Sequence, residues 1–216
     1  MQDHYNSQRI AQMGKHQRAN FINSLSGYKS ANLVGSKGLN GVSNLALISS
    51  AFHVGAHPPL IGMIMRPHTV VRDTLQNIKD TGCYTINHVH TAIAAQAHQC
   101  SARYAPEQSE FIAVGLDEEY SGDFFAPFVA QSRIKFAVEV REIQVLQLNQ
   151  TELVIGEVVA VLIQGDYVKH DGYVDIQKAQ STAVSGLDSY HSAQRIDRYS
   201  YAHPDTDLTS IWNEIS

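Results

Sequence analysis

The sequence predicts a mainly β fold, an antiparallel barrel with peripheral helices. Two long segments rich in Val, Ile and Leu, 133–148 and 151–164, are separated only by Asn149 and Gln150, which indicates a tight hairpin. Shorter apolar segments bounded by Gly, Pro and Asn fill the first half of the chain. Helical patterns are few, and in the second half they do not alternate with strands as a parallel βαβ fold would require.

The first elements are a polar arm and three strands. Residues 1–30 are polar and lack a clean period, so we expect a helical or partly disordered arm. Strands are expected at 31–35 and 44–51, joined by a turn rich in Gly and Asn. After an expected loop, the apolar run 60–65 follows two prolines and predicts a strand buried on both faces.

A short amphipathic helix is expected after Asp73, which is a plausible N-cap. Gln76 lies three residues on and can reach back to the cap, and Gly82 is placed where a C-terminal glycine ends a helix. Leu75 and Ile78 share one face. The other expected elements are a strand at 83–89, helices at 91–99 and 107–114, a turn at Asp171-Gly172, a last strand at 183–190, and a polar tail anchored by Ile211-Trp212.

The composition is that of a globular chain with one sizeable core. The chain has 216 residues, of which 44 % are hydrophobic and 17 % charged. The net charge is −5 and the basic residues are scattered, which argues against a nucleic-acid surface. No apolar run approaches the length of a membrane span, and the polar N-terminus lacks the apolar centre of a signal peptide. Cys83 and Cys100 form no motif, so reduced thiols in the cytoplasm are expected.

Two arginines and a threonine surround the predicted helix start. Arg66 ends the apolar strand, and Arg72 and Thr74 flank Asp73. A helix N-terminus offers unpaired N–H groups and a partial positive charge, and arginine adds a forked donor, so the combination suits phosphate. The alternative is that both arginines are solvated surface charges, and spacing alone leaves both interpretations open.

A second candidate group lies on the strand before it. Asn44, Leu45 and Ala46 lead along the strand to Ser49 and Ser50. Serines at the end of an apolar strand can donate to a planar heterocycle while the backbone supplies further donors and acceptors. The alternative is that these hydroxyls are satisfied by backbone or water.

The histidines and nucleophiles give weaker signals. The chain contains 11 histidines, and His88 and His90 could share a strand face, but no zinc motif is present. We therefore expect no metal, although a metal-dependent hydrolase remains a competing hypothesis. The sequence has no Gly-x-Ser-x-Gly elbow, Walker loop or GxGxxG, so a Rossmann-type nicotinamide site is not indicated.

The stretch 41–87 resembles the flavin reductase-like family, which has the FMN-binding split-barrel fold, a Greek-key antiparallel barrel. It is similar to the branch in which an Asn-Leu-Ala strand precedes a Pro-Pro strand, an Arg-Pro pair and a Thr-x-x-Asn-Ile helix. These motifs lie here at 44–46, 58–59, 66–67 and 74–78, and further similar segments lie at 97–101, 109–111, 154–158 and 185–190. The resemblance divides the chain into an N-terminal arm (1–30), a flavin reductase-like FMN-binding split-barrel domain (31–200) and a C-terminal tail (201–216).

The resemblance implies a homodimer with FMN at or near the subunit interface. The segment 44–50 would contact the flavin ring and ribityl chain, largely through its backbone. Arg66, Arg72 and Thr74 would line the phosphate end, and His98 and Ser101 are further cofactor-binding candidates.

The implied activity is an NAD(P)H-dependent flavin reductase-like oxidoreductase that passes hydride or electrons through FMN to a flavin or another acceptor, with a monooxygenase as one conceivable partner. NADH or NADPH would be the co-substrate. No catalytic side chain is assigned, because the cofactor carries the chemistry. Thr151 occupies the position where many NADH-dependent members have a histidine. The alternative is a non-catalytic FMN-binding electron carrier or flavin-storage protein.

Overall fold

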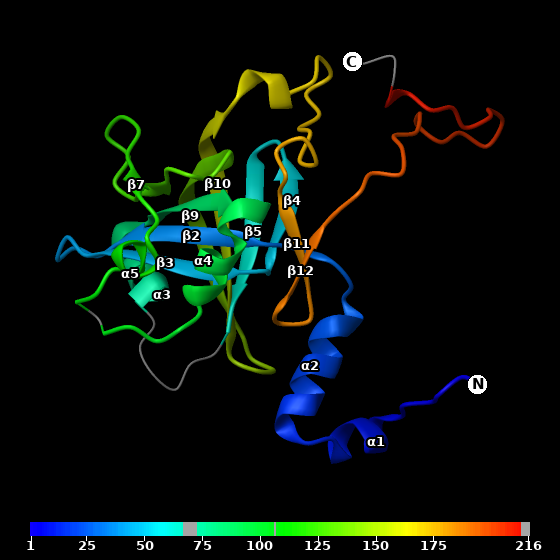
Figure 1. Ribbon diagram of the computed structural model, residues 1–216, viewed down its shortest axis with the longest axis horizontal. Coiled ribbons are helices and arrows are strands. Elements are labelled where there is room, and N and C mark those ends of the chain that lie inside the picture. The colour runs from blue at the N-terminus through cyan, green and yellow to red at the C-terminus, as the bar shows by residue number, and fades with distance from the viewer. Residues whose placement is uncertain (67–72, 106, 213–216) are drawn as a thin grey trace.

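A seven-stranded antiparallel sheet forms the centre of the molecule, in the order β3-β2-β6-β9-β10-β5-β4 (Figure 1). The structure is a computed structural model that describes residues 1–66, 73–105 and 107–212. The strands are β2 (Asn32–Lys37), β3 (Ser43–Ile48), β4 (Ala51–Ala56), β5 (Pro59–Met65), β6 (Cys83–His88), β9 (Ile134–Leu146) and β10 (Thr151–Ile163).

The sheet curls into a split barrel because its two edges are joined by only two residues. β3 and β4 are the opposite edges of the order, yet only Ser49 and Ser50 separate them in the sequence. Six strand spacings would hold the edges of a flat sheet roughly 29 Å apart, whereas a two-residue link spans at most about 10 Å. The edges therefore meet at Ser49-Ser50, the barrel corner, without a β3–β4 ladder. This confirms the predicted mainly β split barrel.

Successive side chains of the barrel strands point to opposite faces and pack in two separate hydrophobic cores. Val34, Tyr84 and Ile86 point into the barrel, where Leu75 and Ile78 of helix α3 (Asp73–Thr81) join them. The outer core lies on the other face of β2 and β3, under α4 (Ala94–Gln99) and α5 (Glu110–Val114); among its members are Leu33, Leu45, Val89, Ala97, Phe111 and Val184. This period of two is what places neighbouring residues of one strand in different environments.

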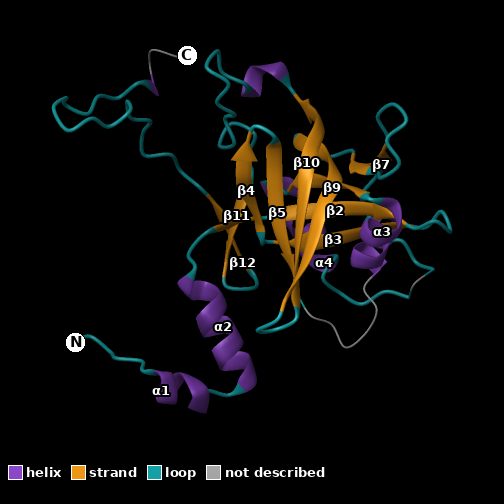
Figure 2. Cartoon of the chain, turned by 180° about the vertical axis from the view of Figure 1, so that it is seen from behind, coloured by secondary structure: helices purple, strands orange, loops and turns teal. Residues whose placement is uncertain are grey.

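A three-stranded sheet flanks the barrel and leads to the arm. Its order is β1-β11-β12, with β1 at Lys29–Ser30, β11 at Thr182–Ser185 and β12 at Ser189–Ser192. The arm consists of α1 (Ser7–Gln12) and α2 (Lys15–Leu25), neither of which has a buried residue, and it projects away from the barrel (Figure 2). The remaining short elements are η1 (Thr91–Ile93), η2 (Gly165–Tyr167), β7 (Glu118–Glu119) and β8 (Phe128–Val129). Within the described ranges, no helix has both the length and the apolar character that a membrane span needs.

The sequence interpretation fails in one stretch. Residues 51–56 form strand β4, where a loop was expected. Phe52 and Val54 alternate with His53, but this pattern covers too few residues to identify a strand, and all three are exposed on this edge strand. Two boundaries also shift: the helix expected at 107–114 begins at Glu110, and the strand expected at 183–190 is a hairpin that turns at Gly186.

Candidate functional site

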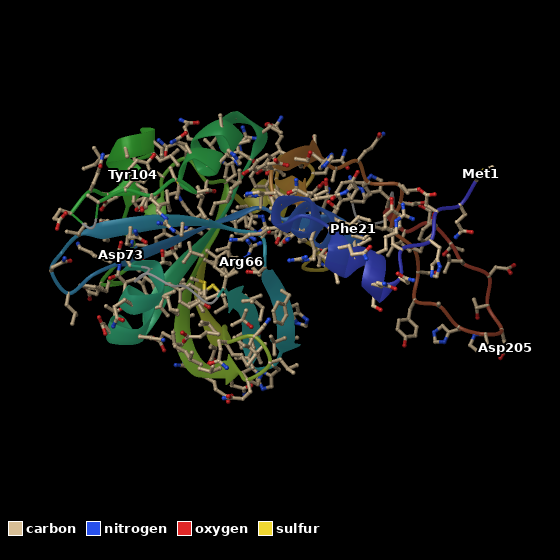
Figure 3. All side chains as sticks on the ribbon, turned by 90° about the horizontal axis from the view of Figure 1, so that it is seen from below. Met1, Phe21, Arg66, Asp73, Tyr104 and Asp205 are labelled. Atoms are coloured by element: carbon tan, nitrogen blue, oxygen red, sulfur yellow. The ribbon has the colours of Figure 1, made fainter. Side chains whose placement is uncertain are left out.

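The barrel corner lies against the end of β5, which leads into Arg66. Ser50 donates from Oγ to the carbonyl of Ile64 at 2.8 Å, which fastens the corner to β5. Arg66 follows two residues later and is exposed. Ser49 is half-buried in the bend between β3 and β4. Figure 3 shows Arg66 on the side of the barrel that faces the arm carrying Phe21.

A second cation lies beside Arg66, and the arm holds both. Arg66 Nη2 donates to Asn23 Oδ1 at 3.1 Å. Lys29 Nζ donates to the main-chain oxygen of Asn23 at 3.1 Å and to that of Gly186 at 2.9 Å. Burial and the positive charge of Arg66 both lower the pKa of Lys29. Sequence reasoning missed Lys29 and Asn23, because an arm without periodicity gave no sign of where it would pack.

Asn44 and Thr74 belong to a buried network at the other end of β3. The Asn44 side-chain amide donates to Glu110 Oε2 at 2.8 Å, and the backbone N–H of Leu45 donates to the same oxygen at 3.0 Å. Thr74 Oγ1 donates to Asn44 Oδ1. Burial raises the pKa of Glu110, and its hydrogen bond from Leu45 opposes that rise. The network ties β3 to both α3 and α5, and sequence reasoning missed Glu110.

The predicted residues therefore separate into two groups. Ser50 lies six residues beyond Asn44 along β3 and its extension, which is roughly 20 Å in an extended chain. Ser49 and Ser50 lie at the corner, where Ser50 is bonded to Ile64, two residues before Arg66, whereas Thr74 is joined to Asn44. Leu45 is fully buried in the outer core, and Ala46 pairs with Val34. Arg72 lies outside the described residues.

His98 and Ser101 lie at the end of α4. His98 Nδ1 is 3.1 Å from the hydroxyl of Tyr190, and the two rings meet edge to face. Burial, together with Cys100 and Asp188, raises the pKa of Tyr190 to about 12. Tyr190 pairs with Val184, and Val184 pairs with Lys29. These three paired residues form one row across the small sheet, with His98 against its first member and Lys29 at its other end. Ser101 is exposed, and its N–H donates to the His98 carbonyl.

Alternative chemistries find little support at the remaining polar groups. In the parts of the chain that the structure describes, no three His, Cys, Asp or Glu side chains gather as a metal-binding group. Burial and the nearby Glu110 raise the pKa of Cys100 to about 12, so its thiol is protonated at neutral pH and a poor nucleophile. The corner, with the two cationic side chains of Arg66 and Lys29, has the donor chemistry that fits a phosphate group.

Comparisons with known proteins agree with the split-barrel fold. The model of the family described as flavin reductase like domain matches residues 29–181. A protein of Shewanella frigidimarina NCIMB 400, assigned as a flavin reductase with a split-barrel domain, is 49 % identical; the match covers 93 % of this chain and 100 % of that one, with a TM-score of 0.90.

Two more distant structures share the fold alone. Component B of nitrilotriacetate monooxygenase from Bacillus cereus is 18 % identical, over 90 % of this chain and 97 % of that one, with a TM-score of 0.79. An FMN-binding protein from Thermus thermophilus is 16 % identical, over 76 % of this chain and 85 % of that one, with a TM-score of 0.62.

Proposed function

The chain belongs to the flavin reductase-like domain family, and from that premise we propose that it binds FMN and acts as an NAD(P)H-dependent flavin reductase-like oxidoreductase. The observation that carries the proposal is the barrel corner, where Ser50 is bonded to β5 and Arg66, which follows that strand, lies beside Lys29. Bound FMN would supply the redox chemistry, taking hydride from NADH or NADPH and passing electrons to a flavin or another acceptor. The protein would bind and orient it.

Each end of the cofactor would have its own set of residues. Arg66 would hold the phosphate, with Arg72 and Thr74 as further proposed phosphate-end residues. The backbone of 44–50 and the α4 end with His98 and Ser101 would border the ring and ribityl chain. Because Thr74 already donates to Asn44, its hydroxyl would support the site chiefly by fixing β3.

We also propose that the active form is a cytoplasmic homodimer. Apolar side chains lie exposed on the edge strand β4 and on the interior strand β10, namely Phe52 (45 % exposed), Val54 (42 %), Val159 (42 %) and Val161 (55 %). Large apolar side chains left in water favour association. A partner monooxygenase is a further proposal, supported by the shared fold of a monooxygenase component B.

The direct test is an anaerobic titration of the purified protein. Protein that is yellow, or turns yellow with added FMN and keeps the colour through a desalting column, would support cofactor binding. Bleaching of the flavin absorbance by NADH or NADPH would then support the reductase. Protein that stays colourless after incubation with FMN would rule the proposal out.

A flavin-binding electron carrier is the second candidate, and Thr151 favours it. Thr151 is buried, and both its N–H and its hydroxyl donate to Asn149 Oδ1. This position is therefore filled by a turn contact rather than by an imidazole that could assist nicotinamide. A carrier would bind FMN yet remain yellow with either nicotinamide, and would bleach only with a chemical reductant such as dithionite.

A further inference from the structure

We infer that the arm completes the phosphate end of the site, with Lys29 as its second cation and Asn23 as the positioning residue that holds Lys29 beside Arg66. This inference rests on the proposed function, since the ligand is the phosphate of FMN. It assigns a ligand-binding role to residues that lie before the barrel strands.

Asn23 accepts hydrogen bonds from two cationic side chains at once. Its side-chain Nδ2 donates to the carbonyl of Ala19 at 2.8 Å, one turn earlier in α2. That contact fixes the amide so that Oδ1 accepts from Arg66, while the main-chain oxygen accepts from Lys29. Asn23 lies in the last turn of α2, where the carbonyl end of the helix favours positive charge. The two cations are therefore brought together by a single residue.

Lys29 keeps one donor for a ligand. An ammonium group has three N–H donors, and two of them are directed at the carbonyls of Asn23 and Gly186. Both acceptors are neutral, and among the described residues no carboxylate lies within ion-pair distance of Lys29. The charge next to Arg66 is thus left for an anion to balance.

The position of Lys29 is fixed from both sides. Lys29 pairs with Val184 of β11, and Gly186 follows in the β11–β12 turn with φ +61°. A side chain at Gly186 would lie 3.1 Å from Ser24 Oγ, so the turn and the arm are in close contact. The ammonium is held where the arm meets the small sheet.

Two adjacent cations match a phosphomonoester better than a carboxylate. A phosphomonoester carries a charge of about −1.5 to −2 at neutral pH, with three acceptor oxygens. Burial and the charge of Arg66 lower the pKa of Lys29, and a dianion between the two would relieve that repulsion.

The first test compares FMN with riboflavin, which lacks the phosphate. The full chain and the variant Lys29→Gln are titrated with each flavin, following flavin fluorescence. We expect FMN to bind about tenfold more weakly to the variant, while riboflavin stays within about twofold. Lys15→Gln is the matched control, because Lys15 is exposed at the far end of α2 and its loss changes the net charge equally. Lys29→Arg should restore part of the FMN affinity.

The second test places a competing carboxylate between the cations. Asn23→Asp keeps the side-chain shape and puts a carboxylate where Oδ1 accepts from Arg66, so we expect it to weaken FMN more than Asn23→Ala does and to spare riboflavin. Both variants lose the bond from Nδ2 to Ala19, so the comparison isolates the added charge. Asn20→Asp, one turn earlier on the exposed surface of α2, adds the same charge away from the pair and should leave FMN binding within about twofold.

The outcomes separate this inference from the proposed function. If the wild-type protein binds neither flavin, both fail. If the wild type prefers FMN and Lys29→Gln keeps that full preference, the inference is wrong and the proposed function stands. Equal weakening of FMN and riboflavin by Lys29→Gln would show a structural role only, and would also overturn the inference.

Discussion

The side-chain amide of Asn44 donates to the carboxylate of Glu110 across 2.8 Å, in a position where both side chains are buried. The same oxygen accepts the backbone N–H of Leu45. Asn44, the first residue of a strand motif expected to face a flavin, therefore uses its side chain to anchor the edge strand β3 to α5.

Replacing Glu110 by Gln should destabilise the protein. Oε2 accepts both hydrogen bonds, so a Gln oxygen that keeps them leaves its NH2 group facing the backbone N–H of residue 110, where two donors meet. Leaving a buried group unpaired costs about 1–3 kcal/mol. Denaturant unfolding of Glu110→Gln measures the loss, and Glu107→Gln, at an exposed position before α5, is the control. Equal stability of the two variants would contradict a structural role for this carboxylate.

Replacing Arg66 by Ala should weaken FMN far more than riboflavin. Riboflavin has no phosphate for the guanidinium of Arg66 to bind. We therefore expect a loss of affinity of about tenfold or more for FMN alone. Thr74→Val is the comparison, because it removes the hydrogen bond to Asn44 and should lower the free energy of unfolding more than the affinity for FMN. Parallel loss of both flavins in Arg66→Ala would mean that Arg66 supports the fold instead.

Replacing Gly35 by Ala should disturb the barrel wall. Gly35 pairs with Leu45 on one side and Thr85 on the other. A Cβ there would collide with the carbonyl oxygen of Pro127 and lie 2.5 Å from Thr85 Oγ1. We expect a cost of about 1–3 kcal/mol in the free energy of unfolding. Gly165→Ala, where nothing lies within 4 Å, should cost much less.

His88 should make the fold sensitive to acid. Burial lowers the pKa of His88 to about 4, and its Nδ1 lies 3.1 Å from Ser181 Oγ. In the unfolded chain the imidazole takes up a proton near its ordinary pKa of 6.5, so between pH 6.5 and 4 the unfolded state binds more protons. Stability is thus lost as the pH falls through that window, by up to about 3 kcal/mol.

The measurement is the free energy of unfolding against pH for the wild type and His88→Gln, in which Gln can still reach Ser181. The variant should show a shallower slope below pH 6.5. Some slope will remain, because burial and the charge of Arg133 also lower the pKa of His90. The exposed His170→Gln should keep the wild-type slope. An unchanged slope in His88→Gln would refute the assignment.

Replacing Val161 by Arg should break the proposed homodimer. Val161 is 55 % exposed on β10, and a charge at the centre of an apolar contact is costly to bury. Light scattering coupled to gel filtration gives the mass of each form. Val145→Arg, near the tip of the β9–β10 hairpin, is the control for adding a charge to an exposed apolar position. A wild-type protein that is monomeric at all concentrations would contradict the proposal.

Most of the barrel could be predicted because strand alternation and turn residues are local signals. The β9–β10 hairpin forms as expected, although its turn spans 147–150 rather than Asn149 and Gln150 alone, and Gly82 ends α3 with a positive φ of +69°. Leu75 and Ile78 share the buried face of α3. Strand β4 escaped detection because an exposed edge strand has no buried face to impose a pattern.

The site was harder to predict than the fold, because its contacts join residues far apart in the chain. Lys29 meets Gly186 only once β1 pairs with β11, and Glu110 reaches Asn44 only after α5 packs on β3. No local pattern marks either partner. The division into arm, domain and tail, and the flavin-binding roles of the predicted site residues, stay predictions.

The two-residue link between β3 and β4 has a consequence for how the barrel opens. Edge strands usually fray one at a time, because each is held by a single neighbour. Here a displacement of β4 pulls on Ser49-Ser50 and so on β3, which Glu110 anchors to α5. We therefore expect the two edges of the sheet to open together as one cooperative unit. The hydroxyl of Ser50, bonded to the Ile64 carbonyl, lies at the point that joins them.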